Sequence, residues 1–240
     1  MFDIHSHIIY HIDDGARTLD EAVELVKSDV SQGATDIIST SHYSVEDPTD
    51  PEEILRKLQE LRERLEEESV PVQLYSGHEV LYFDSMDQHL RDGRILTLAD
   101  SRYVLIEFYP LDGYQKILGA VRKLRRCGYR PVIAHAERFK GLREHGLSEI
   151  IDEGAYIQLS TEPLSMSGFK AMLDGECSFE RKALKNGEAH FLGTDMHRMD
   201  RRPPVLSQAV SWVRKHLPED YAEALLSGNA QYILKDQGFR

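Results

Sequence analysis

The chain has 240 residues, which is enough for one domain of about the size of a (β/α) barrel, or for two small ones. Its 41 acidic and 29 basic residues give a formal net charge of -12 at pH 7, which argues against nucleic acid or an anionic membrane as the main partner. We expect no membrane insertion and a cytoplasmic location, because no apolar run approaches the roughly 20 residues of a membrane span and no secretory signal opens the sequence.

Short apolar, β-branched runs alternate with longer segments of helical period, a pattern typical of βαβ units around a parallel sheet. Seven strands are predicted, at residues 2–5, 35–40, 72–77, 103–108, 131–136, 155–160 and 189–194. The sequence contains no internal repeat, low-complexity tract or flexible linker, so we predict a single domain over residues 1–240.

Capping signals mark the first two predicted helices. Thr18 and Glu21 form a capping box that begins a helix ending at about residue 32. Asp50 and Pro51 begin a second, strongly charged helix that runs to about residue 68. Later helices are predicted near residues 114–127, 167–186, 204–216 and 219–227.

Side chains able to bind metals follow almost every predicted strand at its carboxyl end, where barrel enzymes build their sites. Only the sixth strand is followed by no strong ligand. The set holds five histidines and four carboxylates, one of them from the first loop: His5, His7, Asp14, His42, Glu79, Glu107, His135, Asp195 and His197. A tetrahedral zinc ion takes four ligands, so nine favour two or three ions that share a bridging carboxylate.

The spacing within this set favours a shared site. His5 and His7 are two residues apart, as are Asp195 and His197, and side chains two apart on an extended segment point the same way. Alone, a histidine near a strand end is more often a hydrogen-bonded core or surface residue than a ligand. We predict that role for the histidines that fit the pattern less well: His11, His78, His89, His145, His190 and His216.

Two arginines and two cysteines bear on the type of chemistry. Three divalent ions would outweigh four carboxylates in charge and so favour an anion, and Arg138 and Arg202 could clamp its oxygens with their forked donors. Ordinary surface salt bridges are the alternative role for both. Some phosphatases use a cysteine nucleophile that needs an arginine six residues later. Neither Cys127 nor Cys177 has an arginine at that position, so we interpret both as structural thiols.

The ordered motifs resemble the polymerase-and-histidinol-phosphatase (PHP) superfamily and, more narrowly, the bacterial tyrosine-protein phosphatases of the CpsB/YwqE type. The motifs, within residues 3–204, are DIHSHI with DDG, STSH, GHE, DSRYVLIEF, RPVIAHAER and GTDMH with RRPP. The resemblance implies an α/β fold of the PHP type, a distorted (β/α)7 barrel, with up to three ions of manganese, iron or zinc, of which we favour manganese. It implies the nine ligands above and phosphate binding by Arg138 and Arg202.

The resemblance also implies hydrolysis of phosphotyrosine on a protein, with a tyrosine kinase that controls capsule or exopolysaccharide synthesis as the natural partner. We expect a metal-bridging hydroxide to attack phosphorus, Glu107 to bridge the ions, and Asp14 or His197 to protonate the leaving oxygen. The alternatives are a small-molecule phosphatase, such as a histidinol-phosphate phosphatase, and a non-catalytic metal-bound PHP module. Histidinol-phosphate phosphatases usually carry a Cys-Pro-His-Gly-like turn where this chain has DDG, which favours the protein phosphatase.

Three features depart from the family pattern. They are Tyr10 with His11, His78, and the YPLDGY loop that follows Glu107. All three lie where a substrate would dock, so they bear on the identity of the substrate more than on the chemistry.

Overall fold

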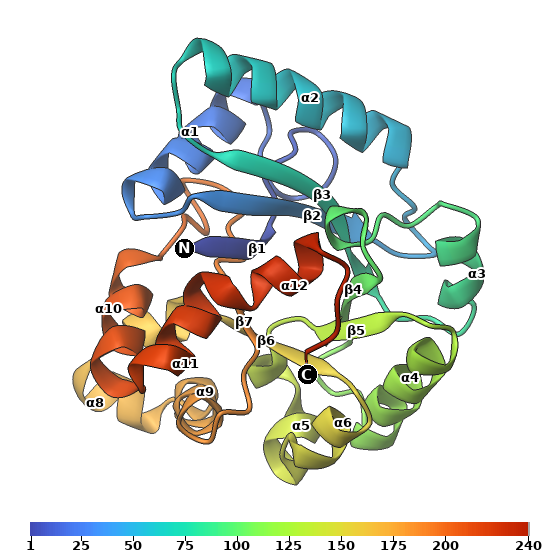
Figure 1. Ribbon diagram of the computed structural model, residues 1–240, viewed down its shortest axis with the longest axis vertical. Helices are drawn as coiled ribbons and strands as arrows, with labels where there is room; N and C mark the ends of the chain where they lie inside the picture. Colours follow the sequence, from blue (N-terminus) through green and yellow to red (C-terminus); the bar gives the residue numbers. More distant parts are fainter. Residues whose placement is uncertain (240) are drawn as a thin grey trace.

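Seven parallel strands form one curved sheet in which neighbours in sequence are also neighbours in space (Figure 1). They are β1 (Phe2–Ser6), β2 (Asp36–Tyr43), β3 (Gln73–Leu81), β4 (Tyr103–Glu107), β5 (Arg130–Ile133), β6 (Tyr156–Ser160) and β7 (Phe191–Gly193). The structure, a computed structural model, describes residues 1–239 except for the side chains of Phe169, Lys170 and Met172. Ser6 forms a parallel bridge with Met196, just after β7, so the sheet curls into the distorted (β/α)7 barrel that was predicted.

Helices cover the outside of this barrel. They are α1 (Leu19–Ser31), α2 (Pro51–Glu67), α3 (Met86–Arg91), α4 (Tyr114–Arg126), α5 (Lys140–His145), α6 (Ser148–Asp152), α7 (Glu162–Ser165), α8 (Gly168–Leu173), α9 (Gly175–Lys185), α10 (Ser207–His216), α11 (Glu219–Glu223) and α12 (Ala230–Leu234), with short 3-10 turns η1 (Leu98–Asp100) and η2 (Ala136–Arg138) and a π-helical turn η3 (Ala224–Gly228). Within residues 1–239 we find no helix whose length and apolar character would let it span a bilayer.

The predicted cap residues begin the first two helices, α1 and α2, but the capping box of α1 is incomplete, because the Glu21 carboxylate accepts from the Arg17 amide at 2.8 Å instead of the Thr18 amide. The Thr18 side chain accepts a hydrogen bond from the Glu21 amide at the start of α1, and that of Asp50 accepts one from the Glu52 amide at the start of α2. The helix predicted over residues 167–186 is wrong as a single element. Asp174 interrupts it, because its extended backbone and its side chain, which accepts from the Cys177 amide, cap a new helix, α9.

Three carboxyl strand ends differ from the prediction by three or four residues, and each difference moves a candidate ligand. β2 and β3 continue to Tyr43 and Leu81, so His42 and Glu79 lie within paired strands rather than after them. β5 stops at Ile133 instead of residue 136, because the chain turns sharply at His135, whose φ is 31°. These shifts follow from pairing with neighbouring strands, which local sequence does not encode.

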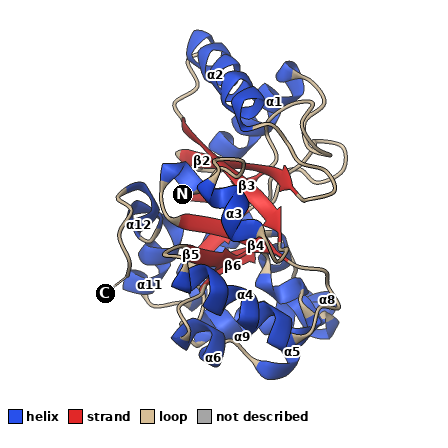
Figure 2. Cartoon of the chain, turned by 90° about the vertical axis from the view of Figure 1, so that its right-hand side faces the viewer, coloured by secondary structure: helices blue, strands red, loops and turns tan. Residues whose placement is uncertain are grey.

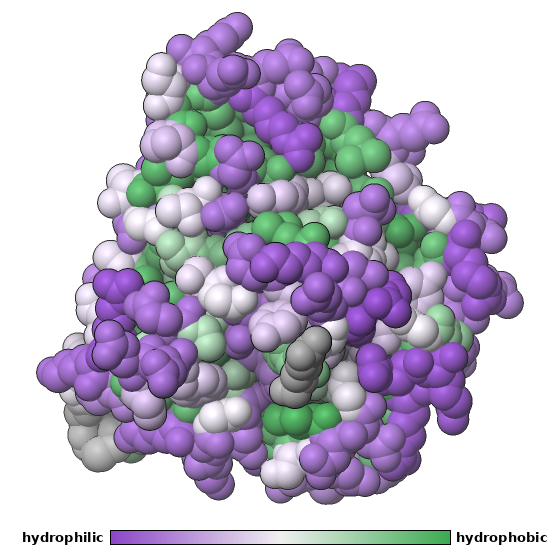
Figure 3. All heavy atoms as spheres, in the orientation of Figure 1, coloured by the Kyte–Doolittle hydropathy of each residue, from purple (hydrophilic) through white to green (hydrophobic). Residues whose placement is uncertain are grey.

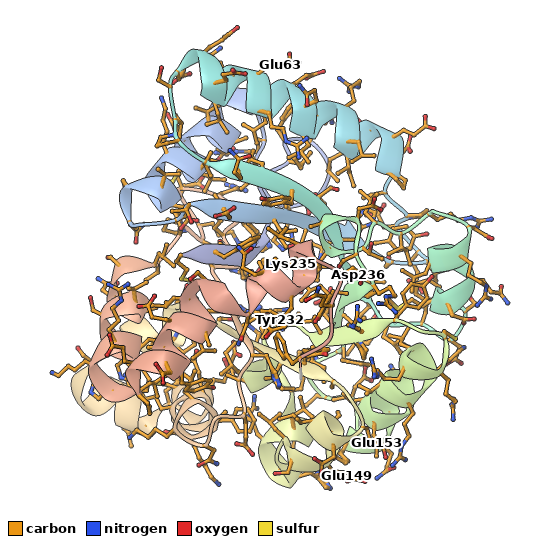
Figure 4. The ribbon with its side chains drawn as sticks, in the orientation of Figure 1. Glu63, Glu149, Glu153, Tyr232, Lys235 and Asp236 are labelled. Atoms are coloured by element: carbon orange, nitrogen blue, oxygen red, sulfur yellow. The ribbon has the colours of Figure 1, made fainter. Side chains whose placement is uncertain are left out.

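The amino-terminal end of the barrel is closed by the last part of the chain. α12 crosses in front of the strands, and Ile233 packs in one buried cluster with strand residues such as Ile4 and Leu105 (Figure 1). Beyond α12, the Asp236 carboxylate binds Arg102 at 2.8 Å and Arg130 at 2.6 Å; Figure 4 labels Asp236 beside Tyr232 and Lys235. Figure 3 shows that this face is mostly hydrophilic, and Figure 2 shows the strands running away from it toward loops on the opposite side.

A buried aspartate joins the first and last strands. Asp3, with no exposed surface, accepts hydrogen bonds from the Thr194 amide at 2.9 Å and the Thr194 hydroxyl at 2.6 Å. Burial raises the pKa of Asp3 to about 6, although these donors lower it. Backbone bonds from Asp195 to His5 and from His7 to Met196, both 2.8 Å, continue the seam. The first and last candidate ligands are therefore held in one register.

We predict that Thr194→Val weakens the fold by about 1–3 kcal/mol in free energy of unfolding, because it removes a donor to a buried carboxylate while keeping the side-chain shape. Urea unfolding followed by circular dichroism measures the change. Thr35→Val is the matched control, since the exposed Thr35 hydroxyl also bonds an aspartate, Asp36, at 2.8 Å; its effect should stay within about 0.5 kcal/mol. Equal effects of the two substitutions would contradict the role given to the seam.

Candidate metal centre

All nine predicted ligands lie at or just beyond the carboxyl ends of the strands. The strands themselves carry His5, His42, Glu79 and Glu107, the loop after β1 carries His7 and Asp14, and the segments after β5 and β7 carry His135, Asp195 and His197. Parallel pairing places these positions level with one another; in the β2–β3 register, His42 stands opposite Glu79.

Their side chains form three overlapping groups in which the ligand atoms lie within 4.8 Å of one another. The groups are His5, His7, Glu79 and Asp195; His42, Glu79 and Glu107; and His7, His42 and His197. Three residues, His7, His42 and Glu79, each belong to two groups. The groups therefore make one continuous cluster, which His135 extends through Glu79 and Asp14 extends through His197, at 2.7 and 3.3 Å.

Glu79 occupies the middle of the cluster. Its Oε2 atom lies 3.1 Å from His5 Nε2, 3.3 Å from His7 Nε2 and 3.2 Å from His42 Nδ1, while its Oε1 atom lies 2.7 Å from His135 Nε2. One carboxylate thus reaches four imidazoles from three strand ends, those of β1, β2 and β5.

Glu107, which we expected to bridge the ions, lies further out. It is 3.4 Å from His42 and 3.7 Å from His135, and its side chain is 21% exposed against 1% for Glu79. The reason is strand length, since β3 extends past Glu79 to Leu81 whereas β4 ends at Glu107 itself. Glu79, and not Glu107, therefore occupies the centre of the candidate ligands.

The cluster keeps its buried carboxylates ionised. Burial alone would raise the pKa of Glu79, but His5 and His135 lower it well below its usual range. The pKa of Asp195 is likewise lowered well below its usual value by His5, against the effect of burial. For His5, burial opposes the charged form, yet Glu79 and Asp195 raise its pKa. Ionised carboxylates therefore face imidazoles within the buried cluster, an arrangement that binds either protons or metal cations.

Two residues that the sequence analysis missed hold the ligands in place. Asp13 Oδ2 accepts from His7 Nδ1 and from the His42 amide, both at 2.9 Å, and His7 lowers the pKa of Asp13 to about 2 although burial opposes it. Gln158 Oε1, from β6, lies 3.1 Å from His5 Nδ1 and accepts from the His135 amide at 2.7 Å. Such bonds fix which ring nitrogen is free to bind a metal. The DDG motif contained a signal for Asp13; an isolated glutamine gave none.

Backbone strain lies beside the ligands. His135 and Asp195 have φ values of 31° and 53°, in the left-handed region that non-glycine residues rarely adopt. Gly15 is required for a different reason, since a Cβ atom there would lie 2.1 Å from the His7 carbonyl oxygen. The loop after β1 can fold tightly against His7 only with glycine at this position.

The two predicted arginines lie at the rim and share one carboxylate oxygen. Arg138 Nη2 and Arg202 Nη1 are 2.7 and 3.0 Å from Asp195 Oδ2. Both guanidinium groups therefore reach the edge of the ligand cluster, rather than pairing with distant surface acids. Asp14, with a side chain 54% exposed, lies nearby, 3.3 Å from His197 and 3.6 Å from His42.

Histidines outside the set have other environments. His78 is fully buried, where its Nδ1 accepts from the Leu96 amide at 2.8 Å and its Nε2 lies 3.1 Å from the Thr49 hydroxyl; burial lowers its pKa to about 3. His11 is exposed, with a φ of 54°. Both lie outside the three ligand groups.

The residues present fit divalent metal ions. Glu79 Oε2 is buried and has no hydrogen-bond donor with good geometry, although three ring nitrogens face it. A buried carboxylate oxygen without a donor is costly. A cation that displaces the ring protons would contact both this oxygen and the ring nitrogens, and mixed imidazole and carboxylate donors suit manganese, iron or zinc.

Comparisons with known proteins agree with this geometry. Residues 1–235 match the family described as capsular polysaccharide synthesis, CpsB/CapC. Tyrosine-protein phosphatase CpsB of Streptococcus agalactiae is 33% identical over 98% of this chain and 99% of its own, and tyrosine-protein phosphatase YwqE of Bacillus subtilis is 29% identical over 99% and 92%.

Solved structures give the same result. A chain from a crystallographic study of YwqE from Bacillus subtilis and CpsB from Streptococcus pneumoniae, described as unique metal-dependent tyrosine phosphatases, has a TM-score of 0.90 at 28% identity over 100% of this chain and 96% of its own. A phosphotriesterase homology protein from Escherichia coli, at 11% identity and a TM-score of 0.55, shares the fold. The chain belongs to the CpsB/CapC family of capsular polysaccharide synthesis.

Proposed function

We propose that this protein is a metal-dependent tyrosine-protein phosphatase that removes phosphate from phosphotyrosine. The observation that carries the proposal is the continuous cluster of three ligand groups with two arginines at its rim. Relatives named tyrosine-protein phosphatase, which match almost the whole chain, support the same reaction.

We assign the nine side chains of the cluster as ligands of two or three divalent ions, with manganese favoured over iron or zinc. Glu79 belongs to two of the three groups and would help to hold the ions in both. When bound, such ions supply positive charge for the phosphate oxygens and acidify the attacking water. Asp13 and Gln158 orient the imidazoles of His7 and His5 toward the cluster.

The chain's own groups would bind the phosphate and handle the proton. Arg138 and Arg202 have forked donors that can turn from Asp195 to phosphate oxygens, where charge spreads during phosphoryl transfer. His197 Nε2 and Asp14 Oδ1 lie 3.3 Å apart, and a proton held between them could pass to the leaving phenolate oxygen in a state in which this pair does not ligate an ion.

The substrate that we propose is a phosphotyrosine protein, in particular a bacterial tyrosine kinase that controls capsule or exopolysaccharide synthesis. The family description, capsular polysaccharide synthesis, supports this setting. We expect the reaction to take place in the cytoplasm, where kinases have ATP.

Removing the metal should abolish activity. We expect a chelator to stop hydrolysis of a phosphotyrosyl peptide, added manganese to restore it, and thiol alkylation to leave it unchanged. Cys177 is buried and burial raises its pKa, and Cys127 is exposed but has no part in the cluster. Metal analysis of fresh protein accompanies the assay. Activity that survives chelation but is lost on alkylation would contradict the proposal.

Replacing His135 by Ala should remove one ion and reduce turnover by about 100-fold or more, because His135 is the ligand that faces Glu79 Oε1 at 2.7 Å. Metal content per chain and kcat are the measurements. His216→Ala, which changes an exposed histidine on α10, serves as control and should keep both values. If the His135 variant retained the full metal content, its assignment as a ligand would be refuted.

Replacing Arg202 by Ala should lower kcat/KM for a phosphotyrosyl peptide by about 10- to 100-fold, since a charged donor to the phosphate is lost. Metal content should be unchanged, which separates this effect from that of His135→Ala. Arg214→Ala is the matched control, because Arg214 is an exposed arginine of α10 that pairs with Glu223 of α11. An unchanged kcat/KM in the Arg202 variant would show that Arg202 only pairs with Asp195.

A further inference from the structure

Most of the strongly exposed large apolar side chains gather at the end of the barrel that carries the cluster. Within the described residues, six are at least 40% exposed. Val45 follows β2, Tyr109 and Leu111 follow β4, and Met199 follows β7, whereas the other two, Leu55 and Leu173, lie on α2 and α8. Single exposed apolar residues are ordinary, but a concentration around one opening indicates a contact surface.

The loop after β4, which we call the β4 loop (residues 108–113), presents two of these side chains. Tyr109 is 58% exposed and Leu111 is 83% exposed, while Phe108 between Glu107 and Tyr109 is buried in the core. Tyr109 follows Glu107 by two residues, so the Cα atoms of the two residues lie within about 7 Å of each other. Glu107 itself lies at the outer part of the cluster. The loop is thus next to the position that a bound phosphate ester would occupy.

Hydrogen bonds hold this loop in shape despite its exposure. The Tyr109 amide donates to the Asp112 carboxylate at 3.0 Å, the Asp112 amide donates to the Tyr109 carbonyl at 2.9 Å, and the Lys140 amide donates to the Pro110 carbonyl at 3.1 Å. Leu111 therefore projects from a braced turn. Fixing an exposed leucine in this way is useful for binding, because little loop entropy is lost when a partner covers it.

The charges of the β4 loop are already paired, so the surface that it offers is apolar. Asp112 binds Lys116 at 2.8 Å, and Lys116 lies 5.8 Å from the centre of the Tyr109 ring. A strongly charged peptide segment would find neither Asp112 nor Lys116 free, because the two already pair with each other. An apolar side chain would remove Leu111 and the Tyr109 ring from water.

We propose that Tyr109 and Leu111 bind an apolar residue that flanks the phosphotyrosine in the substrate protein, so that the β4 loop selects peptides with an aliphatic neighbour. This inference rests on the proposed function, because it places a phosphotyrosine in the cluster. Arg138 and Arg202 bind the phosphate, and the β4 loop binds the chain beside it. The sequence already predicts that this loop, YPLDGY, lies where a substrate would dock; its exposed side chains now give a specific contact.

The test compares two phosphotyrosyl peptides that differ only in the residues flanking the phosphotyrosine, which are leucine in one and serine in the other. The quantity measured is the ratio of kcat/KM for the two peptides, in which any general loss of activity cancels. The enzymes are the wild type, Leu111→Ala, the double variant Tyr109→Ala with Leu111→Ala, and Leu55→Ala. The last removes an equally large exposed leucine from α2, away from the opening.

We expect the wild type to favour the leucine peptide by about tenfold, the effect of burying about one aliphatic side chain. The ratio should fall to about threefold or less in Leu111→Ala and approach one in the double variant, while Leu55→Ala keeps the wild-type ratio. Because both β4 loop residues are exposed, neither substitution should prevent folding.

A wild-type ratio near one, or a ratio that the β4 loop variants do not change, would overturn the inference and leave the proposed phosphatase activity intact. If neither peptide is hydrolysed with manganese supplied, the proposed function and the inference both fail. Sedimentation of the same variants tests whether a second copy of the chain, and not a substrate, binds this surface. A change of oligomeric state in Leu111→Ala, with an unchanged peptide ratio, would assign this surface to a second copy of the chain and overturn the inference.

Discussion

The rest of the site depends on one constraint, a carboxylate placed in the interior of the protein among four imidazoles. Glu79 is 1% exposed, and its two oxygens face four rings from three strand ends. Neither the acid nor the histidines would be stable there alone, because a buried charge without a partner costs several kcal/mol. The carboxylate and the imidazoles offset one another's cost of burial. Oxygen and nitrogen donors that face one another are also what a divalent cation needs.

The barrel supplies this arrangement because its strands are parallel and neighbours in sequence. Each carboxyl end adds its own side chain to the same opening, and the closure between β1 and β7 brings the two ends of the chain together. Asp3 and Thr194 secure that closure one residue away from Asp195, so the stability of the seam and the placement of the ligand cannot be separated. Hydrogen bonds to Asp13 and Gln158 then fix the orientation of the His7 and His5 rings.

Most strands, most helices and the candidate ligands could be predicted because they depend on local sequence patterns. Strand and helix alternation predicted a parallel sheet with flanking helices, and the family resemblance implied that the sheet closes into a barrel. Metal-capable residues at the predicted strand ends predicted which side chains would meet. The central position of Glu79 could not be predicted, since it depends on how far β3 continues in pairing with β2. Gln158 was missed for a related reason, because only the closed barrel shows that β6 faces both His5 and His135. Asp174, which divides the predicted helix, has the same capping chemistry as Thr18 but lies inside a helical pattern.

Strain at two of the candidate ligands explains how short strands can serve so crowded a site. His135 and Asp195 adopt left-handed backbone angles directly after β5 and β7, at a cost of about 1–3 kcal/mol each. The turns bring Arg138 and His197 back over the opening instead of letting the chain continue outward. Hydrogen bonds offset the cost, since the His135 amide donates to Gln158 and the Asp195 amide donates to the His5 carbonyl. The bonds that hold the ligands therefore also hold the strained turns, and a single set of contacts fixes both the cluster and the arginine at its rim.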